Sequence, residues 1–154
     1  MFKYTKILLF LIVTTFLLSF SCNNEKSPVP YRHFEVHVNL SCPYFMNLGL
    51  GNNVFIDAEV CGVIDKRGSS GLGIIVYRLM PNIFVSFDRM CTSTTHEPVA
   101  VVLSTENPFY LVCPKCDSKY LISDGSIVSG TAKFYLMEFN TAYYPSNNLL
   151  VISN

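Results

Sequence analysis

Four side chains that bind soft metal ions fall in two short, separate stretches of the sequence. Cys91 and His96 form a C-x4-H pair, and sixteen residues later Cys113 and Cys116 form the pair C-P-K-C. Thiolate and neutral imidazole bind borderline and soft metals well. Two ligand-bearing loops separated by the length of a β-hairpin are a common way to build a small metal site. These four residues therefore predict one.

The segments that must position these loops have the pattern of β-strands. His33 to Leu40 alternates apolar and polar residues, which is typical of a half-buried strand. Clusters of Gly, Pro, Asn and Ser separate the segments, and no window of twelve residues outside the first twenty-one shows helical spacing. An all-β, mostly antiparallel sandwich or barrel follows. The other expected strands are Val54–Val60, Gly73–Leu79, Ile83–Asp88, Val99–Leu103, Phe109–Cys113, Ser118–Tyr120, Lys133–Phe139 and Leu149–Ser153.

The spacing of these residues resembles that of a Rieske [2Fe-2S] domain, whose motifs are C-T-H, C-P-x-H-G-S-x-F, D-G, G-P-A and Pro-Leu. The resemblance covers roughly residues 85–153. It implies a Rieske-like antiparallel β-sandwich or barrel over residues 33–154, with a small ligand-loop subdomain at about 87–130. The matching residues are Cys91-Thr92-Ser93, Cys113-Pro114-Lys115-Cys116-Asp117-Ser118-Lys119-Tyr120, Asp124-Gly125, and Gly130-Thr131-Ala132 with Leu136.

The departures from the Rieske pattern fall on the metal ligands. The two family cysteines correspond to Cys91 and Cys113, whereas Ser93 and Cys116 stand where the family has its two histidines. His96 lies outside the family's ligand positions, and a loop that folds back would bring it in as the fourth ligand of a Cys3His set. The resemblance therefore supports the fold better than it supports a [2Fe-2S] cluster.

The first twenty-one residues have the composition of an export signal. Lys3 and Lys6 precede an apolar run from Ile7 to Leu18, which is too short for a permanent membrane span. The following residues, Ser19-Phe20-Ser21-Cys22, resemble a loose bacterial lipobox, which implies that Cys22 becomes the lipidated N-terminus. An ordinary cleaved signal, with Cys22 as a spare thiol, is the alternative. Residues 22–32 then read as a polar, Pro-containing tether that buries little and holds the domain off the membrane.

Charge and length limit the function classes. Removal of Lys3 and Lys6 lowers Lys plus Arg from 11 to 9 against 11 Asp plus Glu, so the mature chain has a net charge of −2. Nucleic acid binding needs clustered basic residues, and none is expected here. The 133 residues after the leader suit a single domain and a monomer. No catalytic motif is present, so an enzyme is not expected. The expected location is the bacterial cell envelope, with a lipid anchor at the periplasmic face or the cell surface.

Export to an oxidising compartment leaves alternatives open for the cysteines. Cys42 and Cys61 follow two neighbouring expected strands and are candidates for a disulfide worth about 3 kcal/mol, or else two unconnected core thiols. Cys113 and Cys116 could likewise pair with each other. Cys91 is also consistent with a small buried hydrophobe, and His96 with an exposed loop residue. Asp88 and Arg89, just before Cys91, are expected to form a local ion pair that fixes the loop.

Three hypotheses from different classes follow. The first is a Rieske-like electron carrier that holds an iron–sulfur cluster with altered ligands and meets a redox partner protein. The second is a structural module in which Cys91, His96, Cys113 and Cys116 hold Zn²⁺ in a closed tetrahedron. The third is a domain without a metal whose cysteines pair or stay reduced. Metal, sulfide and thiol analysis separates the three.

Overall fold

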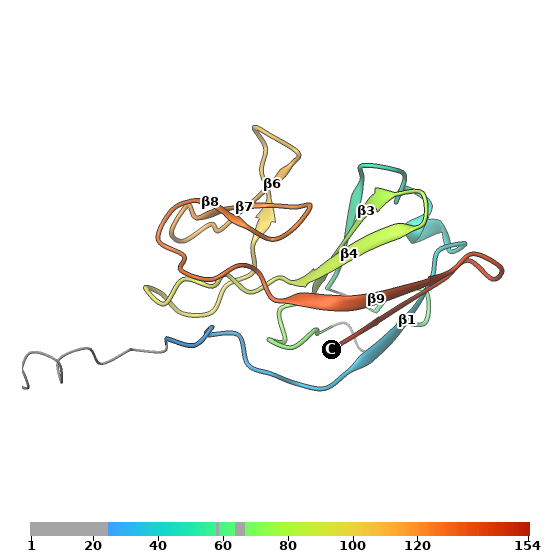
Figure 1. The fold of residues 1–154 in the computed structure, drawn as a ribbon, viewed down its shortest axis with the longest axis horizontal. Helices are drawn as coiled ribbons and strands as arrows, with labels where there is room; N and C mark the ends of the chain where they lie inside the picture. Colours follow the sequence, from blue (N-terminus) through green and yellow to red (C-terminus); the bar gives the residue numbers. More distant parts are fainter. Residues whose placement is uncertain (1–24, 58, 64–66) are drawn as a thin grey trace, which may run out of the picture.

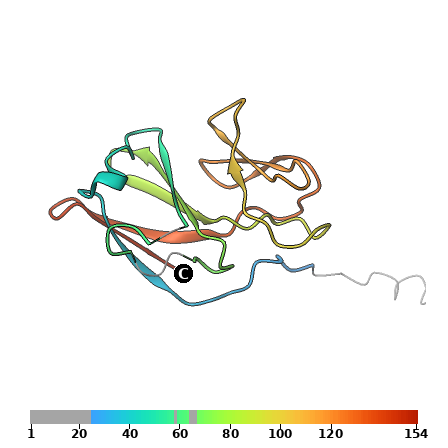
Figure 2. The ribbon, with the colours of Figure 1, turned by 180° about the vertical axis from the view of Figure 1, so that it is seen from behind.

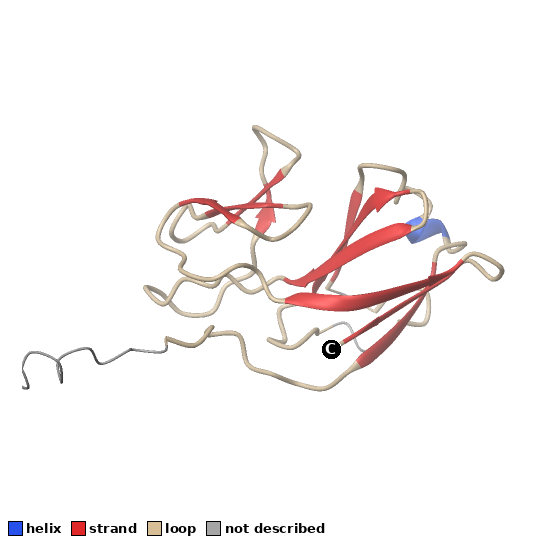
Figure 3. Cartoon of the chain, in the orientation of Figure 1, coloured by secondary structure: helices blue, strands red, loops and turns tan. Residues whose placement is uncertain are grey.

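The computed structural model describes residues 25–57, 59–63 and 67–154. The leader and Cys22 lie outside these residues. Within them, all regular structure is β-strand apart from one short 3-10 helix, η1 (Pro43–Phe45), so the all-β prediction is confirmed. Figure 3 shows the strands in two separate groups, which correspond to two antiparallel sheets.

The larger sheet has six strands in the order β1-β10-β9-β4-β3-β2. Every neighbouring pair in it is antiparallel, and β1 and β2 form its edges. It curls into a half-barrel, seen to the right in Figure 1. Its strands are β1 (Glu35–Asn39), β2 (Asn53–Ile56), β3 (Ile74–Met80), β4 (Ile83–Asp88), β9 (Glu138–Tyr144) and β10 (Leu149–Ser153).

The smaller sheet has four short strands in the order β5-β6-β7-β8. They are β5 (Val102–Leu103), β6 (Tyr110–Val112), β7 (Lys119–Leu121) and β8 (Ile127–Ser129). This sheet is inserted between β4 and β9, which pair directly with each other in the larger sheet. It corresponds to the expected ligand-loop subdomain, and both views of the ribbon place it beside the half-barrel (Figures 1 and 2).

The inside of the half-barrel is filled by one face of each strand. The alternation predicted for β1 is present: Val36 and Val38 are buried while their neighbours are exposed. They join one apolar cluster with Ile56 of β2 and Ile152 of β10. Because both edge strands contribute to the same cluster, the sheet must curl around it. Burial of these side chains is the main force that holds the half-barrel together.

The middle of the larger sheet is covered on both faces. In β3, Ile74 and Val76 belong to the half-barrel core, whereas Ile75 and Tyr77 belong to a second cluster under the smaller sheet. A continuous apolar run is what a strand buried on both sides requires. Phe87 of β4 extends the second cluster toward Cys91. The larger sheet therefore acts as the platform on which the ligand loops rest.

Strand ends differ from the predictions where pairing stops. Val54–Val60 was expected to be a single strand, but β2 ends at Ile56 because β3 offers no partner before Ile74. The strand predicted at Lys133–Phe139 begins instead at Glu138 and runs to Tyr144. The segment before it crosses between the two sheets, where Leu136 donates its backbone N–H to the carbonyl of Gly125.

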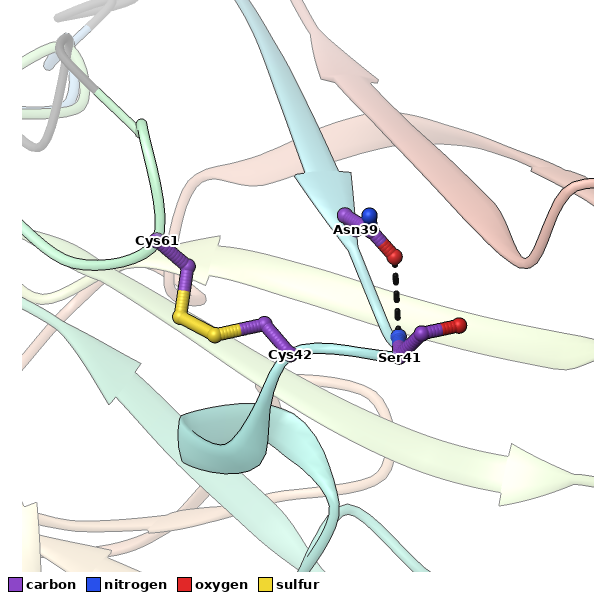
Figure 4. The surroundings of a disulfide bond; sticks show 4 residues. All are labelled: Asn39, Ser41, Cys42 and Cys61. Atoms are coloured by element: carbon purple, nitrogen blue, oxygen red, sulfur yellow. Dashed lines mark hydrogen bonds between the residues drawn. A yellow bond between two sulfur atoms is a disulfide. The ribbon is translucent and has the colours of Figure 1, made fainter.

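A disulfide joins Cys42 and Cys61, with their Cα atoms 6.2 Å apart (Figure 4). Cys42 follows the edge strand β1 and Cys61 follows the other edge strand, β2, so the bond links the two edges of the half-barrel. The backbone turn before Cys42 is fixed by Asn39, whose side-chain oxygen accepts the N–H of Ser41 at 2.9 Å.

The described chain ahead of β1 buries little, as expected, because Val29 is the one buried residue of 25–32, but it makes several contacts with the domain. Val29 is buried, with 9% of its surface exposed. The side chain of Glu25 forms an ion pair with Lys133, at 2.7 Å. Arg32 donates its backbone N–H to the hydroxyl of Ser69 at 3.3 Å.

None of the described helices is long and apolar enough to cross a membrane.

Candidate metal centre

The four candidate ligands lie on two loops, one that joins the two sheets and one within the smaller sheet. Cys91 and His96 lie between β4 and β5, and Cys113 and Cys116 lie between β6 and β7. The second loop is a tight turn in which Asp117 donates its N–H to the carbonyl of Cys113 at 3.0 Å. Asp117 has φ 52°, a left-handed conformation that closes the turn. The first loop is paired at its base, where Cys91 donates its N–H to Val99.

The two loops converge on a common centre. The Sγ atoms of Cys91 and Cys116 are 3.8 Å apart. The Nε2 atom of His96 lies 3.3 Å from Sγ of Cys116 and 3.4 Å from Sγ of Cys113. All four ligand atoms lie within 4.8 Å of one another.

These distances match the edges of a tetrahedron around one ion. With Zn–S bonds of about 2.3 Å, two sulfurs of a tetrahedral site are about 3.8 Å apart. With a Zn–N bond of about 2.0 Å, a sulfur and a nitrogen are about 3.5 Å apart. The three printed distances therefore match a single zinc-sized ion held by Cys91, His96, Cys113 and Cys116, and all four ligand atoms are close enough to reach it with small adjustments of the loops.

Burial differs across the candidate metal centre. Cys91 and Cys113 are buried against the cluster under the smaller sheet, with 1% and 0% of their surfaces exposed. Cys116 and His96 are half-buried. The centre therefore has a dry inner side and an outer side formed by the imidazole and the third sulfur.

The electrostatics of the two ends of the centre are opposite. Burial raises the pKa of the Cys91 thiol to about 12 in the absence of a cation, despite opposing hydrogen bonds from Tyr120 and Ser93. At Cys116, burial also acts to raise the pKa, but hydrogen bonds from Ser118 and from His96 outweigh it and lower the pKa to about 5. The pKa of His96 is raised by its hydrogen bond to the Glu97 carbonyl and by Cys116. A bound cation would favour the thiolate form of all three sulfurs.

Ser118 supports the half-buried sulfur of Cys116, and its hydrogen bonds fix the direction of its hydroxyl group. Its hydroxyl oxygen accepts the backbone N–H groups of Thr131 and Ala132, each at 3.0 Å. Both lone pairs are then used, so the hydroxyl hydrogen points to Sγ of Cys116 at 3.1 Å. Gly130 permits this packing: a Cβ there would lie 2.3 Å from the Cα of Ser118.

Tyr120 supports the buried sulfur. Its hydroxyl accepts the backbone N–H of Thr92 at 3.0 Å and lies 3.3 Å from Sγ of Cys91. Burial raises the pKa of Tyr120 well above its ordinary value, so the phenol keeps its proton. The side chain of Thr92 donates to the carbonyl of Phe134, which leaves the Tyr120 proton to be shared by Cys91 and the Thr92 oxygen.

The residue at the first family histidine position does not join the ligands. The Ser93 hydroxyl bonds those of Thr95 and Thr131, at 2.8 and 3.0 Å. Its backbone N–H instead approaches Sγ of Cys91, at 3.5 Å. The structure thus groups His96, and not the side chain of Ser93, with the three sulfurs.

The predicted ion pair between Asp88 and Arg89 is wrong. Asp88 is fully buried and accepts hydrogen bonds from the backbone and hydroxyl of Ser70 and from the backbone of Met90. Arg89 extends the other way and pairs with Asp57, at 2.5 Å. Side chains of adjacent residues in extended chain point to opposite faces, so Asp88 and Arg89 contact different partners. Asp88 still fixes the start of the ligand loop, through Met90.

Ser118, Tyr120 and Thr92 were not identified as site residues from the sequence. Ser118 contacts Cys116, two residues away, but the other contacts that fix these side chains join residues 13 to 42 positions apart. The one local signal was that Ser118 and Tyr120 stand two apart on a strand after the second ligand pair, and so share its face. Comparison with protein-family models gave no match, and comparison with curated proteins gave no relative.

Proposed function

We propose that the chain is a membrane-anchored metal-binding protein in which Cys91, His96, Cys113 and Cys116 hold one structural Zn²⁺ ion. The observation that carries this proposal is the mutual distance of the four ligand atoms, none more than 4.8 Å from another. Three thiolates and one imidazole in a tetrahedron are a standard ligand set for structural zinc.

A single ion fits these distances better than a two-iron cluster. In a Rieske centre the two histidines bind one iron and the two cysteines bind the other. By that resemblance Cys116 would serve a different iron from Cys91, and the two sulfurs would be separated by the cluster core. Their separation of 3.8 Å is that of two ligands on the same ion.

The site is suited to a structural role. All four positions around the ion are filled by protein, so no position is left for a substrate or an activated water. The strands of the smaller sheet are only two or three residues long, and such short strands are marginal without support. One ion bound by both ligand loops would tie β4 and β5 to β6 and β7. The half-barrel has its own closure, the Cys42–Cys61 disulfide.

The anchor is the second part of the proposal. Met1–Ser21 would be removed as a leader, and Cys22 would carry the lipid that holds the protein at the bacterial envelope. Disulfides persist in exported proteins, and the bond between Cys42 and Cys61 supports export. Two or more acyl chains give firm membrane attachment.

The electron carrier remains as a second candidate because of one feature of the structure. The Gly130-Thr131-Ala132 turn packs on the C-P-K-C-D-S loop through Ser118, so the segments that carry the resemblance are in contact. In that case the site would hold iron and sulfide, and the third thiolate would lower its reduction potential.

Analysis of the purified chain from Asn23 onward tests these candidates. We expect one zinc per chain, no acid-labile sulfide and no visible absorption. His96→Ala should lower the zinc content, whereas His33→Ala, an exposed histidine on another part of the chain, should not. Iron with acid-labile sulfide would replace the zinc proposal by the electron carrier. Absence of metal, together with one free thiol among the five cysteines, would replace it by a domain with a second disulfide bond.

A further inference from the structure

The segment ahead of β1 packs against the ligand-loop end of the molecule. The Glu25 carboxylate contacts the Lys133 ammonium through both oxygens, at 2.7 and 2.9 Å. Lys133 lies in the connection from β8 to β9, two residues after the Thr131 that contacts Ser118. Four residues beyond Glu25, the buried side chain of Val29 holds the segment a second time. Figures 1 and 2 both show this segment entering at the end of the molecule where β7 and β8 lie.

The attachment point of the proposed lipid is close to this contact along the chain. Cys22 precedes Glu25 by three residues, which span at most about 11 Å when fully extended. A lipid on Cys22 would therefore start within that distance of the Glu25 backbone, beside Lys133. The turn between β9 and β10, at residues 145–148, lies at the opposite end of the molecule in both views.

The ligand-loop end carries side chains that suit a bilayer surface. Tyr135, two residues after Lys133, is 64% exposed. Tyrosine favours the membrane–water interface, where its ring is apolar and its hydroxyl stays hydrated. Lys26 can extend its charged end toward lipid phosphates, whereas Lys133 is held by Glu25. These side chains lie outside the apolar core, so contact with lipid would leave the core intact.

We infer that residues 25–31 hold the domain with its ligand-loop end against the phospholipid surface, rather than holding the domain away from it. The inference rests on the proposed lipidation of Cys22. The partner is the bilayer that contains the protein's own anchor. In this orientation the outer side of the metal centre is at the membrane end, and the β9–β10 turn projects into solution.

Tryptophan fluorescence can test this orientation because the chain contains no tryptophan. Tyr135→Trp places a single reporter at the ligand-loop end, and Tyr144→Trp places one beside the β9–β10 turn. Both tyrosines are exposed in the structure, at 64% and 51%. The lipidated full chains would be inserted into phosphatidylcholine vesicles with or without bromine in the acyl chains. We expect bromine to cause a loss of fluorescence from Tyr135→Trp and none from Tyr144→Trp.

Flotation with the vesicles separates failure of the orientation from failure of the anchor. The lipidated chain should float with the vesicles and Cys22→Ser should not. If the lipidated chain fails to float, both the anchor proposal and this inference are wrong. A chain that floats but shows equal quenching at both reporters, greater quenching at Tyr144→Trp, or no quenching at either, overturns the orientation alone.

A charge swap tests the contact that sets the orientation. Glu25→Lys should reduce the quenching of the Tyr135→Trp reporter, because two lysines then repel each other. Glu25→Lys combined with Lys133→Glu should restore it, since the swap rebuilds the pair with its charges exchanged. Unchanged quenching in Glu25→Lys would contradict a role for this ion pair. The vesicles are zwitterionic, so a change in protein net charge has little effect on attraction to the surface.

Discussion

Replacement of Ser118 by alanine should weaken both the fold of the smaller sheet and its metal centre. The Ser118 hydroxyl accepts two backbone N–H groups at 3.0 Å and donates to Sγ of Cys116 at 3.1 Å. The side chain is fully buried. Alanine would leave two donors of the Gly130-Thr131-Ala132 turn without their acceptor and one sulfur without its donor.

The loss of stability in Ser118→Ala depends on how far water can replace the lost hydrogen bonds. An unsatisfied buried donor costs about 1–3 kcal/mol. Thr131 is exposed and Ala132 half-buried, so water can replace part of the loss, and we expect the free energy of unfolding to fall by about 2–3 kcal/mol. Loss of a hydrogen bond to a metal ligand typically weakens metal affinity about 10- to 100-fold. Urea unfolding measures the first quantity, and competition with a chromophoric chelator measures the second.

Ser129→Ala is the matched control. Ser129 lies on β8 of the same small sheet, and its side chain is exposed. Such a surface change should alter stability by less than about 0.5 kcal/mol. If Ser118→Ala and Ser129→Ala gave the same unfolding midpoint and the same zinc affinity, the assigned role of the Ser118 hydroxyl would be refuted.

Four further predictions concern the cysteines and one glycine. In the metal-free chain the depressed pKa of Cys116, about 5, should make it react with iodoacetamide well below pH 9, and zinc should protect it; no reaction below pH 8 would contradict the assignment. Because folding lowers the pKa of Cys116, ionisation of this thiol stabilises the folded chain fully above pH 9, and the stabilisation is lost as the pH falls toward 5. Urea unfolding of the metal-free chain at several pH values would measure this loss. Cys42→Ala with Cys61→Ala should lower the free energy of unfolding by about 3 kcal/mol with the zinc content unchanged; a parallel loss of zinc would show that the two parts are coupled. Gly130→Ala should lower zinc affinity more than Gly71→Ala does: both glycines have positive φ, but only at Gly130 would the added Cβ meet a backbone carbon of the ligand loop, at 2.3 Å. Equal affinities would mean that this close packing does not position the ligands.

The sequence predicted the features that depend on local pattern. Alternation in β1 identified its buried face, and the C-x4-H and C-P-K-C pairs identified the four side chains that the structure brings together. Both signals lie in a few consecutive residues. The fold class followed because nearly every segment carries the same kind of pattern, so an error in one strand leaves the class unchanged.

The features missed depend on partners far away in the chain. The position of β9 is set by its pairing with β4 and β10, and apolar content alone put that strand too early. Asp88 found its donors in Ser70, eighteen residues back, instead of in its neighbour Arg89. The ion pair of the polar segment before β1 was not predicted, because no local pattern shows that Glu25 will contact Lys133.

X-ray absorption at the zinc edge of the purified chain would show directly which atoms bind the ion. We expect one zinc with three sulfur neighbours at about 2.3 Å and one nitrogen neighbour at about 2.0–2.1 Å. Four sulfur or oxygen neighbours without nitrogen would contradict the assignment of His96 as a ligand. Iron accompanied by bridging sulfide, in place of zinc, would contradict the single-ion site itself.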